Sequence, residues 1–183
     1  MERRLAAILA TDVVGYSRLM EQDEAETFER LRTHRKELFE PEIERHHGRI
    51  FKLMGDGVLA EFASVVNAVE CAVALQRGMA ERNAGLADVR RIDVRIGINL
   101  GDVIVEGDDV HGDGVNIAAR LQAFADVGGV VVSGTVYDQL QGKLGMPLDS
   151  VGEQRVKNIA RPVRVYRVLL NGGRGEDGAA PAG

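Results

Sequence analysis

Residues 50–62, IFKLMGDGVLAEF, constrain the fold of this chain more than any other segment. Two apolar runs flank Asp56-Gly57, and an Asp-Gly pair between such runs is a strong signal for a tight β-hairpin. Segments with a helical apolar period lie on either side, at about 23–48 and 65–83. Further strands are predicted at 5–11 and 92–100. This order predicts an α+β fold with a ferredoxin-like βαββαβ core, a mixed antiparallel sheet and helices packed on it.

The helices carry local start and stop signals. We expect the first to begin at Asp23, with Glu26 completing a capping box, and Pro41 to kink or interrupt it. Its expected apolar stripe comprises Phe28, Leu31, Leu38 and Ile43. A third helix is predicted near Val115, after a stretch rich in glycine and aspartate. A strand at 130–133, a helix at 134–141 and strands near 150–157 and 163–170 are expected as a C-terminal extension.

Composition favours one globular domain, predicted to span residues 1–170. The net charge of −5 comes from interspersed charges of both signs, which argues against a nucleic-acid or anionic membrane surface. No apolar run approaches the ~20 residues of a membrane span. Cys71, the only cysteine, falls in a helical apolar pattern, which predicts a buried thiol and a reducing, cytoplasmic location. Residues 171–183 are expected to form a disordered linker, which in a longer protein would lead to further domains.

Two aspartates follow strands that the predicted topology makes parallel. Asp12 ends the first strand and Asp56 follows the second, so both carboxylates are expected at one edge of the sheet. Adjacent carboxylates repel unless a cation lies between them, and Mg²⁺ or Mn²⁺ takes such oxygen ligands while leaving positions open for phosphates. Asp56 as a turn residue and nothing more is an equally weighted alternative at this point. Gly15, Tyr16 and Ser17 precede a helix, where backbone N–H groups can bind phosphate oxygens.

Three segments together resemble the signature blocks of the class III nucleotidyl cyclase catalytic domain. They are ATDVVGYS, FKLMGDGVLAEF and DDVHGDGVNIAARL, and the resemblance covers about residues 5–170. It implies a palm-type ferredoxin fold and two metal ions per site, Mg²⁺ or Mn²⁺. The implied reaction converts a nucleoside triphosphate to its 3′,5′-cyclic monophosphate and pyrophosphate. By this resemblance Asp12 and Asp56 bind the metals, together with the backbone carbonyl of Val13.

The positions that match the purine-selecting residues of the family are Lys52 and Asp109. Adenine offers an acceptor at N1 and a donor at its amine, which suit a donor-only ammonium and an acceptor-only carboxylate. Guanine presents the opposite pattern, and each mispaired buried group costs roughly 1–3 kcal/mol. The sequence therefore favours ATP. Without the family match, an exposed strand lysine and a turn aspartate would be the simpler interpretations.

Asn116 and Arg120 are four residues apart on the predicted third helix and so share a face. The family match makes Asn116 an orienter of the ribose and Arg120 a clamp on the phosphate, a role that suits the arginine fork. A solvated polar helix face is the alternative. Lys157 is the nearest match to a further phosphate-binding cation of the family, and Arg161 is its rival.

In this family the metal-binding and the base-reading residues come from different subunits. Because this chain holds both sets, the resemblance implies a homodimer with two equivalent interfacial sites. The favoured function is an adenylate cyclase. The alternatives are a guanylate cyclase and a non-catalytic module that binds ATP or dimerises without turnover. A diguanylate cyclase would need a GG(D/E)EF loop, and the hairpin here reads LMGDGV.

Overall fold

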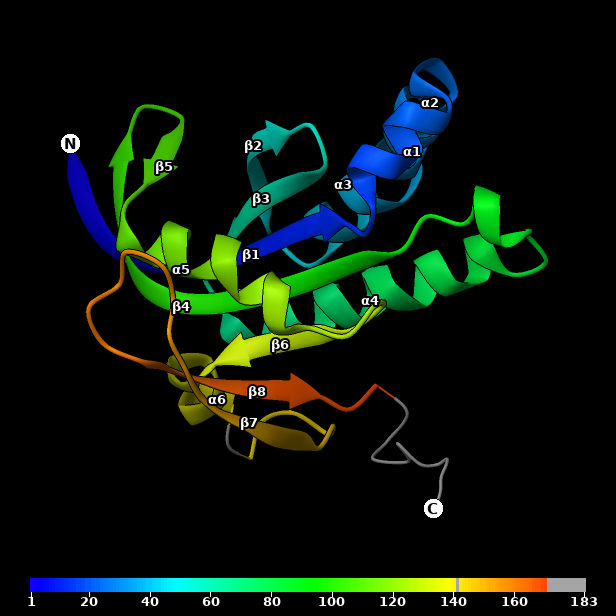
Figure 1. The fold of residues 1–183 in the computed structure, drawn as a ribbon. Helices are drawn as coiled ribbons and strands as arrows, with labels where there is room; N and C mark the ends of the chain where they lie inside the picture. The colour runs from blue at the N-terminus through cyan, green and yellow to red at the C-terminus, as the bar shows by residue number, and fades with distance from the viewer. Residues whose placement is uncertain (141, 171–183) are drawn as a thin grey trace.

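The computed structural model describes residues 1–140 and 142–170, so the predicted linker at 171–183 lies outside the described residues. Figure 1 shows the arrangement of the elements. The strands are β1 (Glu2–Val13), β2 (Arg49–Met54), β3 (Gly57–Phe62), β4 (Val94–Glu106), β5 (Asp109–His111), β6 (Val130–Ser133), β7 (Leu148–Gln154) and β8 (Val163–Val168). The α-helices are α1 (Tyr16–Gln22), α2 (Glu24–His34), α3 (Glu40–Arg45), α4 (Val65–Asn83), α5 (Asp113–Leu121) and α6 (Gly134–Leu140). Shorter helical turns are the π-helical η1 (Arg35–Phe39) and the 3₁₀ segments η2 (Asp88–Arg90) and η3 (Gln122–Phe124).

One sheet runs through the molecule in the order β2-β3-β1-β4-β6-β8-β7, and β5 pairs with the end of β4. β3 is antiparallel to both β1 and β2, so β1 and β2 run parallel to each other with β3 between them. β1 and β4 are antiparallel over their full shared length, whereas β4 and β6 are parallel. The first half of the chain therefore has the predicted ferredoxin-like topology, and β6 to β8 with α6 extend it.

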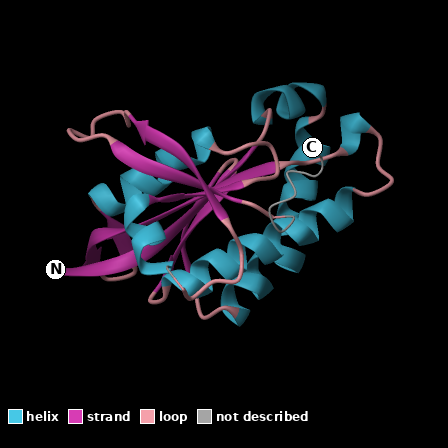
Figure 2. Cartoon of the chain, turned by 90° about the horizontal axis from the view of Figure 1, so that it is seen from below, coloured by secondary structure: helices cyan, strands magenta, loops and turns pink. Residues whose placement is uncertain are grey.

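The two faces of the sheet are covered differently. On one face Ala7 and Leu9 of β1 pack in the main core with α4 and with η1 and α3. On the other face Ala6, Ile8 and Ala10 pack against α5. We call this second side the α5 face. Figure 2 shows helices on both sides of the sheet, so that the strands form the middle layer.

Small residues of β4 allow α5 to lie close to the sheet. A Cβ atom at Gly97 would come within 2.8 Å of the backbone nitrogen of Gln122, at the end of α5. A Cβ at Gly101 would come within 3.3 Å of Gly114, at the start of α5. The absence of side chains at positions 97 and 101 of β4 therefore allows α5 to pack closely against the sheet.

Most predicted elements are present, and the differences have physical reasons. The predicted helix at 65–83 and the strand at 130–133 match α4 and β6. Asp23 caps α2 by accepting a hydrogen bond from the Glu26 backbone at 3.0 Å, as predicted. The predicted interruption near Pro41 is present, because the π-helical η1 separates α2 from α3 and Pro41 lies in the first turn of α3. Phe28 was expected in the buried stripe, and this expectation is wrong, since its side chain is 61% exposed.

Cys71 is buried on α4, as its apolar neighbours predicted. Burial raises the pKa of its thiol to about 12, with Glu42 adding to the shift, so the thiol is neutral and unreactive. Within residues 1–140 and 142–170, none of the helices has the length and apolar character needed to cross a membrane.

Candidate active site

The two aspartates predicted to converge do lie next to each other. The β1–β3 pairing continues beyond its last regular pair, and the backbone N–H of Val13 donates to the carbonyl of Asp56 at 2.8 Å. Asp12 is thereby adjacent to the turn between β2 and β3. Asp12 also continues the alternation of Ala6, Ile8 and Ala10, so its side chain is on the α5 face.

The environment of Asp12 is unusual for a carboxylate. Its side chain is 17% exposed, and its Oδ2 atom lies 3.4 Å from Nη2 of Arg95, its cross-strand partner on β4. Its Oδ1 atom is buried and has no hydrogen-bond partner among the described residues. Burial raises the pKa of Asp12, the Arg95 guanidinium opposes this shift, and the negative charge of Asp56 adds to it.

These features test whether a divalent cation fits. A buried carboxylate oxygen without a partner is costly, and a second carboxylate beside it increases the cost. A hard cation shared by Asp12 and Asp56 would remove both penalties. Among the described residues, no third His, Cys, Asp or Glu completes a metal-binding group. Two carboxylates alone suit Mg²⁺ or Mn²⁺, because these ions take their remaining ligands from water and substrate phosphates. The residues present therefore fit the predicted metals.

The turn that carries Asp56 is held by main-chain contacts. The backbone N–H of Val58 donates to Oγ1 of Thr11 at 3.1 Å. A Cβ atom at Gly57 would lie 1.7 Å from the carbonyl oxygen of Thr11, so only glycine lets the turn approach β1 this closely. On the other side of β1, the backbone N–H of Val14 donates to Asp93 at 2.8 Å. The end of β1 is thus fixed on both sides.

The predicted phosphate-binding turn follows directly after Asp12 and Val13. Gly15 has a φ of 69° and precedes the first residue of α1, a conformation that favours glycine. Ser17 is exposed at the helix start. Tyr16 packs against the main core, and its hydroxyl would lie 3.1 Å from a Cβ atom at Gly55, so this side chain supports the turn.

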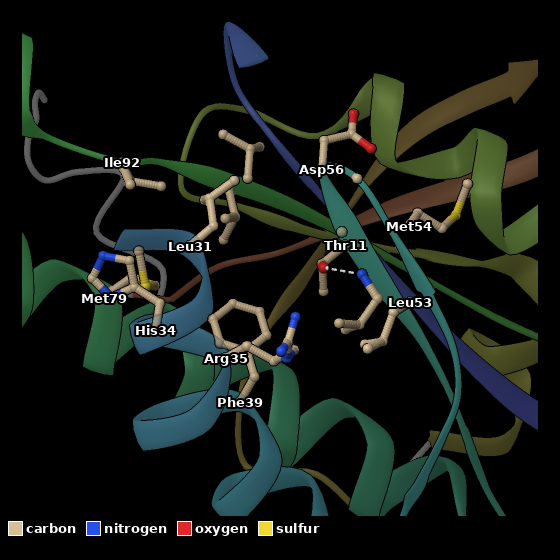
Figure 3. Close-up of a pocket in the computed structure, with 15 residues that line it drawn as sticks. Thr11, Leu31, His34, Arg35, Phe39, Leu53, Met54, Asp56, Met79 and Ile92 are labelled. Carbon is tan, nitrogen blue, oxygen red and sulfur yellow. Dashed lines mark hydrogen bonds between the residues drawn. The ribbon is translucent and has the colours of Figure 1, made fainter. Parts of the chain in front are cut away.

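A cavity of about 60 Å³ lies beneath the turn, on the side away from α5. Figure 3 shows that Leu31, Phe39 and other side chains of α2 and η1 line it, while the Asp56 carboxylate points away from it. His34 and Arg35 supply its polar groups together with Thr11. This mostly apolar space backs the turn, and the carboxylates face the opposite side.

The predicted base-reading residues lie on neighbouring segments. Residue 51 forms a bulge in β2, so Arg49 and Lys52 pair with Glu61 and Leu59, which share a face of β3. Leu59 packs in the cluster on the α5 face, and Lys52 therefore lies on that face too. The turn before Asp109 approaches β2, because both terminal nitrogens of Arg49 contact the Asp108 carbonyl. Lys52 and Asp109 are both exposed.

The remaining predicted residues are also exposed. Asn116 and Arg120 lie on α5, four residues apart as expected. Lys157 and Arg161 lie in the loop between β7 and β8. The end of this loop lines a cavity together with Arg3 and the start of α5, whereas Asp12 pairs with Arg95 near the start of β4. One chain thus places Lys157 and Asp109 at one end of β4 and the carboxylates at the other.

The sequence alone did not reveal the role of Arg95. It falls within the predicted strand at 92–100, but its contact with Asp12 depends on the register between β1 and β4. The ion pairs that Glu61 makes with Arg4 and Arg49 were also missed. A glutamate inside the apolar run VLAEF was the available signal for that cluster.

Comparison with known proteins identifies the family. Residues 3–171 match the Adenylate and Guanylate cyclase catalytic domain. The chain belongs to this family. It is 52% identical over 166 residues to a Rhizobium meliloti protein named "Putative adenylate cyclase 3", covering 91% of this chain and 28% of that protein. The chain therefore spans less than a third of that relative's length.

Solved cyclase structures share the fold. An adenylate/guanylate cyclase/hydrolase from Silicibacter pomeroyi superposes with a TM-score of 0.86 at 44% identity, covering 92% of this chain and 98% of that one. The adenylyl cyclase CyaB from P. aeruginosa gives 0.77 at 25% identity, covering 92% and 96%. The predicted family and the predicted fold are confirmed. The family includes enzymes for both purines, so the base must be argued from the residues of this chain.

Proposed function

We propose that this cyclase domain converts ATP to 3′,5′-cyclic AMP and pyrophosphate at sites shared between two copies of the chain. One observation carries the proposal: Asp12 and Asp56 lie side by side, and the Oδ1 atom of Asp12 is buried without a partner among the described residues. Asp12, Asp56 and the carbonyl of Val13 would hold Mg²⁺ or Mn²⁺. These ions would lower the pKa of the attacking hydroxyl and stabilise the departing pyrophosphate.

The reaction forms a bond from the ribose 3′-oxygen to the α-phosphorus and breaks the bond from that phosphorus to the pyrophosphate oxygen. The hydroxyl proton is lost to solvent or to a substrate phosphate. The N–H groups at the start of α1, after Gly15, would bind the phosphates. Arg120 would clamp the phosphates where charge develops, and Asn116 would orient the ribose. Lys157, with Arg161 as its alternative, would contact the pyrophosphate.

ATP is proposed over GTP because of Lys52 and Asp109. An ammonium donates to N1 of adenine and a carboxylate accepts from its amine, whereas guanine would leave both groups mispaired. Two mismatches of roughly 1–3 kcal/mol each predict a preference on the order of 10²–10⁴.

The dimer is proposed from the exposure of four candidate residues that do not bind metal. Lys52, Asp109, Asn116 and Arg120 are exposed, while the metal-binding carboxylates are partly buried. Within one chain, Asp109 lies beyond the end of β4 and Asp12 pairs near its start. A two-fold dimer would bring the exposed set of one subunit to the carboxylates of the other and form two equivalent sites.

The test is to incubate the purified chain with Mn²⁺ and either ATP or GTP and to identify the products by chromatography and mass spectrometry. We expect cyclic AMP from ATP, and a rate lowered about 10²-fold or more in Asp56→Ala. Cyclic GMP as the main product would contradict the base assignment. Nucleotide binding without a cyclic product from either purine would instead support the non-catalytic alternative.

A further inference from the structure

The α5 face also buries a glutamate, Glu61, that is not part of the proposed metal site. Glu61 lies on β3, directly opposite Ile8, and is 8% exposed. A carboxylate in such a place requires charged hydrogen-bond partners. Glu61 has two: Arg4 donates to Oε1 at 2.7 Å, and Nε of Arg49 donates to Oε2 at 2.8 Å.

The two arginines differ in what else they contact. Arg49 also directs both terminal nitrogens at the carbonyl oxygen of Asp108, at 3.4 and 3.5 Å. Both distances exceed the usual N–H···O range of about 2.7–3.2 Å, so each contact is weak. Arg4 pairs with the same glutamate, and the described residues give it no bond to this turn. Glu61 therefore holds two guanidinium groups, only one of which reaches the segment before Asp109.

The segment that Arg49 reaches is anchored at Val110, which is buried in the cluster on the α5 face, whereas the turn before Asp109 is exposed. The β4–β5 turn, Gly107-Asp108, is exposed, and Gly107 has a φ of 62°, with open space within 4 Å of where a Cβ atom would lie. β5 has only three residues, pairing with Ile104–Glu106 of β4. The bulge at residue 51 puts Arg49 on the same face of β2 as Lys52. One guanidinium thus links the strand of Lys52 to the turn of Asp109.

We propose that Arg49, held by Glu61, is a positioning residue that sets Asp109 relative to Lys52 and so sharpens the selection of adenine over guanine. The inference rests on the proposed function, in which Lys52 and Asp109 read the base. Arg49 does not touch the substrate. Its loss displaces the acceptor of the adenine amine, which weakens ATP binding more than the chemical step.

The test compares Arg49→Met, Arg49→Lys and the matched control Arg4→Met in the full chain. Steady-state kcat and KM are measured for ATP and for GTP with Mn²⁺, and thermal unfolding is followed by circular dichroism. We expect Arg49→Met to raise KM for ATP about 3- to 10-fold and to lower the ATP-to-GTP ratio of kcat/KM similarly, as for loss of one hydrogen-bonded contact. The change in kcat should be smaller than about twofold.

The control separates positioning from stability. Arg4→Met also removes an ion pair of Glu61 and should lower the melting temperature, but it should keep the wild-type ATP-to-GTP ratio. Arg49→Lys should give a ratio between those of Arg49→Met and the wild type. Its ammonium can still pair with Glu61, but it cannot also fork toward Asp108. If Arg49→Met does not fold, Arg49→Lys carries the test against Arg4→Met.

The outcomes also distinguish this inference from the proposed function. An active, ATP-preferring wild type whose ratio is unchanged in the Arg49 variants overturns the inference alone. An equal loss of the ratio in Arg4→Met overturns it as well, because the effect would then follow stability. A wild type that forms no cyclic nucleotide overturns the proposed function and this inference together.

Discussion

The turn between β2 and β3 contains Asp56 and the turn between β4 and β5 immediately precedes Asp109, yet these two tight hairpin connections are built differently. The first is fixed by backbone contacts to β1 on one side and backed by the core on the other. The second is exposed; Val110 just after it is buried on the α5 face, and the guanidinium of Arg49 contacts the turn itself. The turn of Asp56 is bonded to a neighbouring strand through its backbone, whereas the turn before Asp109 is contacted by a side chain, Arg49, in addition to the pairing of its own hairpin.

This difference corresponds to the two proposed tasks. A metal site requires carboxylates at fixed positions, because the ion tolerates little change in ligand distance. Base selection depends on small differences in hydrogen bonding, which the position of one loop can tune by about 1 kcal/mol. We infer that substitutions around the first turn affect folding and metal binding, and that substitutions around the second affect substrate preference.

The largest expected effect comes from a methyl group at the first turn. In Gly57→Ala the new Cβ atom would lie 1.7 Å from the Thr11 carbonyl, and neither backbone can yield without breaking the β1–β3 pairing. We expect a loss of about 3 kcal/mol or more of unfolding free energy in urea titrations. Gly107→Ala is the matched control at the second turn. It places a side chain at φ 62° in open space and should cost about 1–2 kcal/mol. Equal costs at both turns would contradict the comparison.

A smaller effect concerns the support beneath the first turn. His34 lines the cavity there, and its Nδ1 atom accepts a hydrogen bond from Nε of Arg82 at 3.0 Å. Burial, with the positive charges of Arg82 and Arg30, lowers the pKa of His34 to about 4. The unfolded chain, with a histidine pKa of about 6.5, then binds more protons than the native state between these values. Stability should fall as the pH drops from about 6.5 to 4, by about 1–2 kcal/mol after allowance for solvent screening.

Denaturant titrations of wild type and His34→Gln across this pH range measure that contribution. The glutamine can still accept from Arg82 but does not titrate, so the variant should lose less stability on acidification than the wild type. If the free energy of unfolding of the two proteins falls equally on acidification, His34 is not held neutral by the packing under the turn.

Local signals in the sequence were sufficient for much of the fold. The hairpin at 50–62 is specified by turn chemistry and the helix at 65–83 by its apolar period, and both are present as predicted. The order of the elements predicted the topology, and the parallel direction of β1 and β2 then placed Asp12 beside Asp56. The prediction that these two aspartates are neighbours depended only on strand direction, so errors in the predicted strand lengths did not affect it.

Other features depend on contacts between distant segments and could not be read locally. The charged start of β1, Glu2 to Arg4, becomes a strand because it pairs with the end of β4. The bulge at residue 51 reverses which face Lys52 occupies, and nothing in the run IFKLM indicates it. The contact of Arg95 with Asp12 likewise requires the register of two long strands. Phe28 satisfied a helical period and is nonetheless exposed.

The central claim is that the fixed carboxylates of one copy work with the exposed residues of another. Mixing Asp56→Ala with Arg120→Ala tests it directly. Each variant alone should be nearly inactive. With random exchange about half of the dimers are mixed, and each mixed dimer has one intact site of two, so about one quarter of the wild-type cyclic AMP activity should return. Activity of the mixture no greater than the sum of the two separate variants would contradict a site shared between subunits.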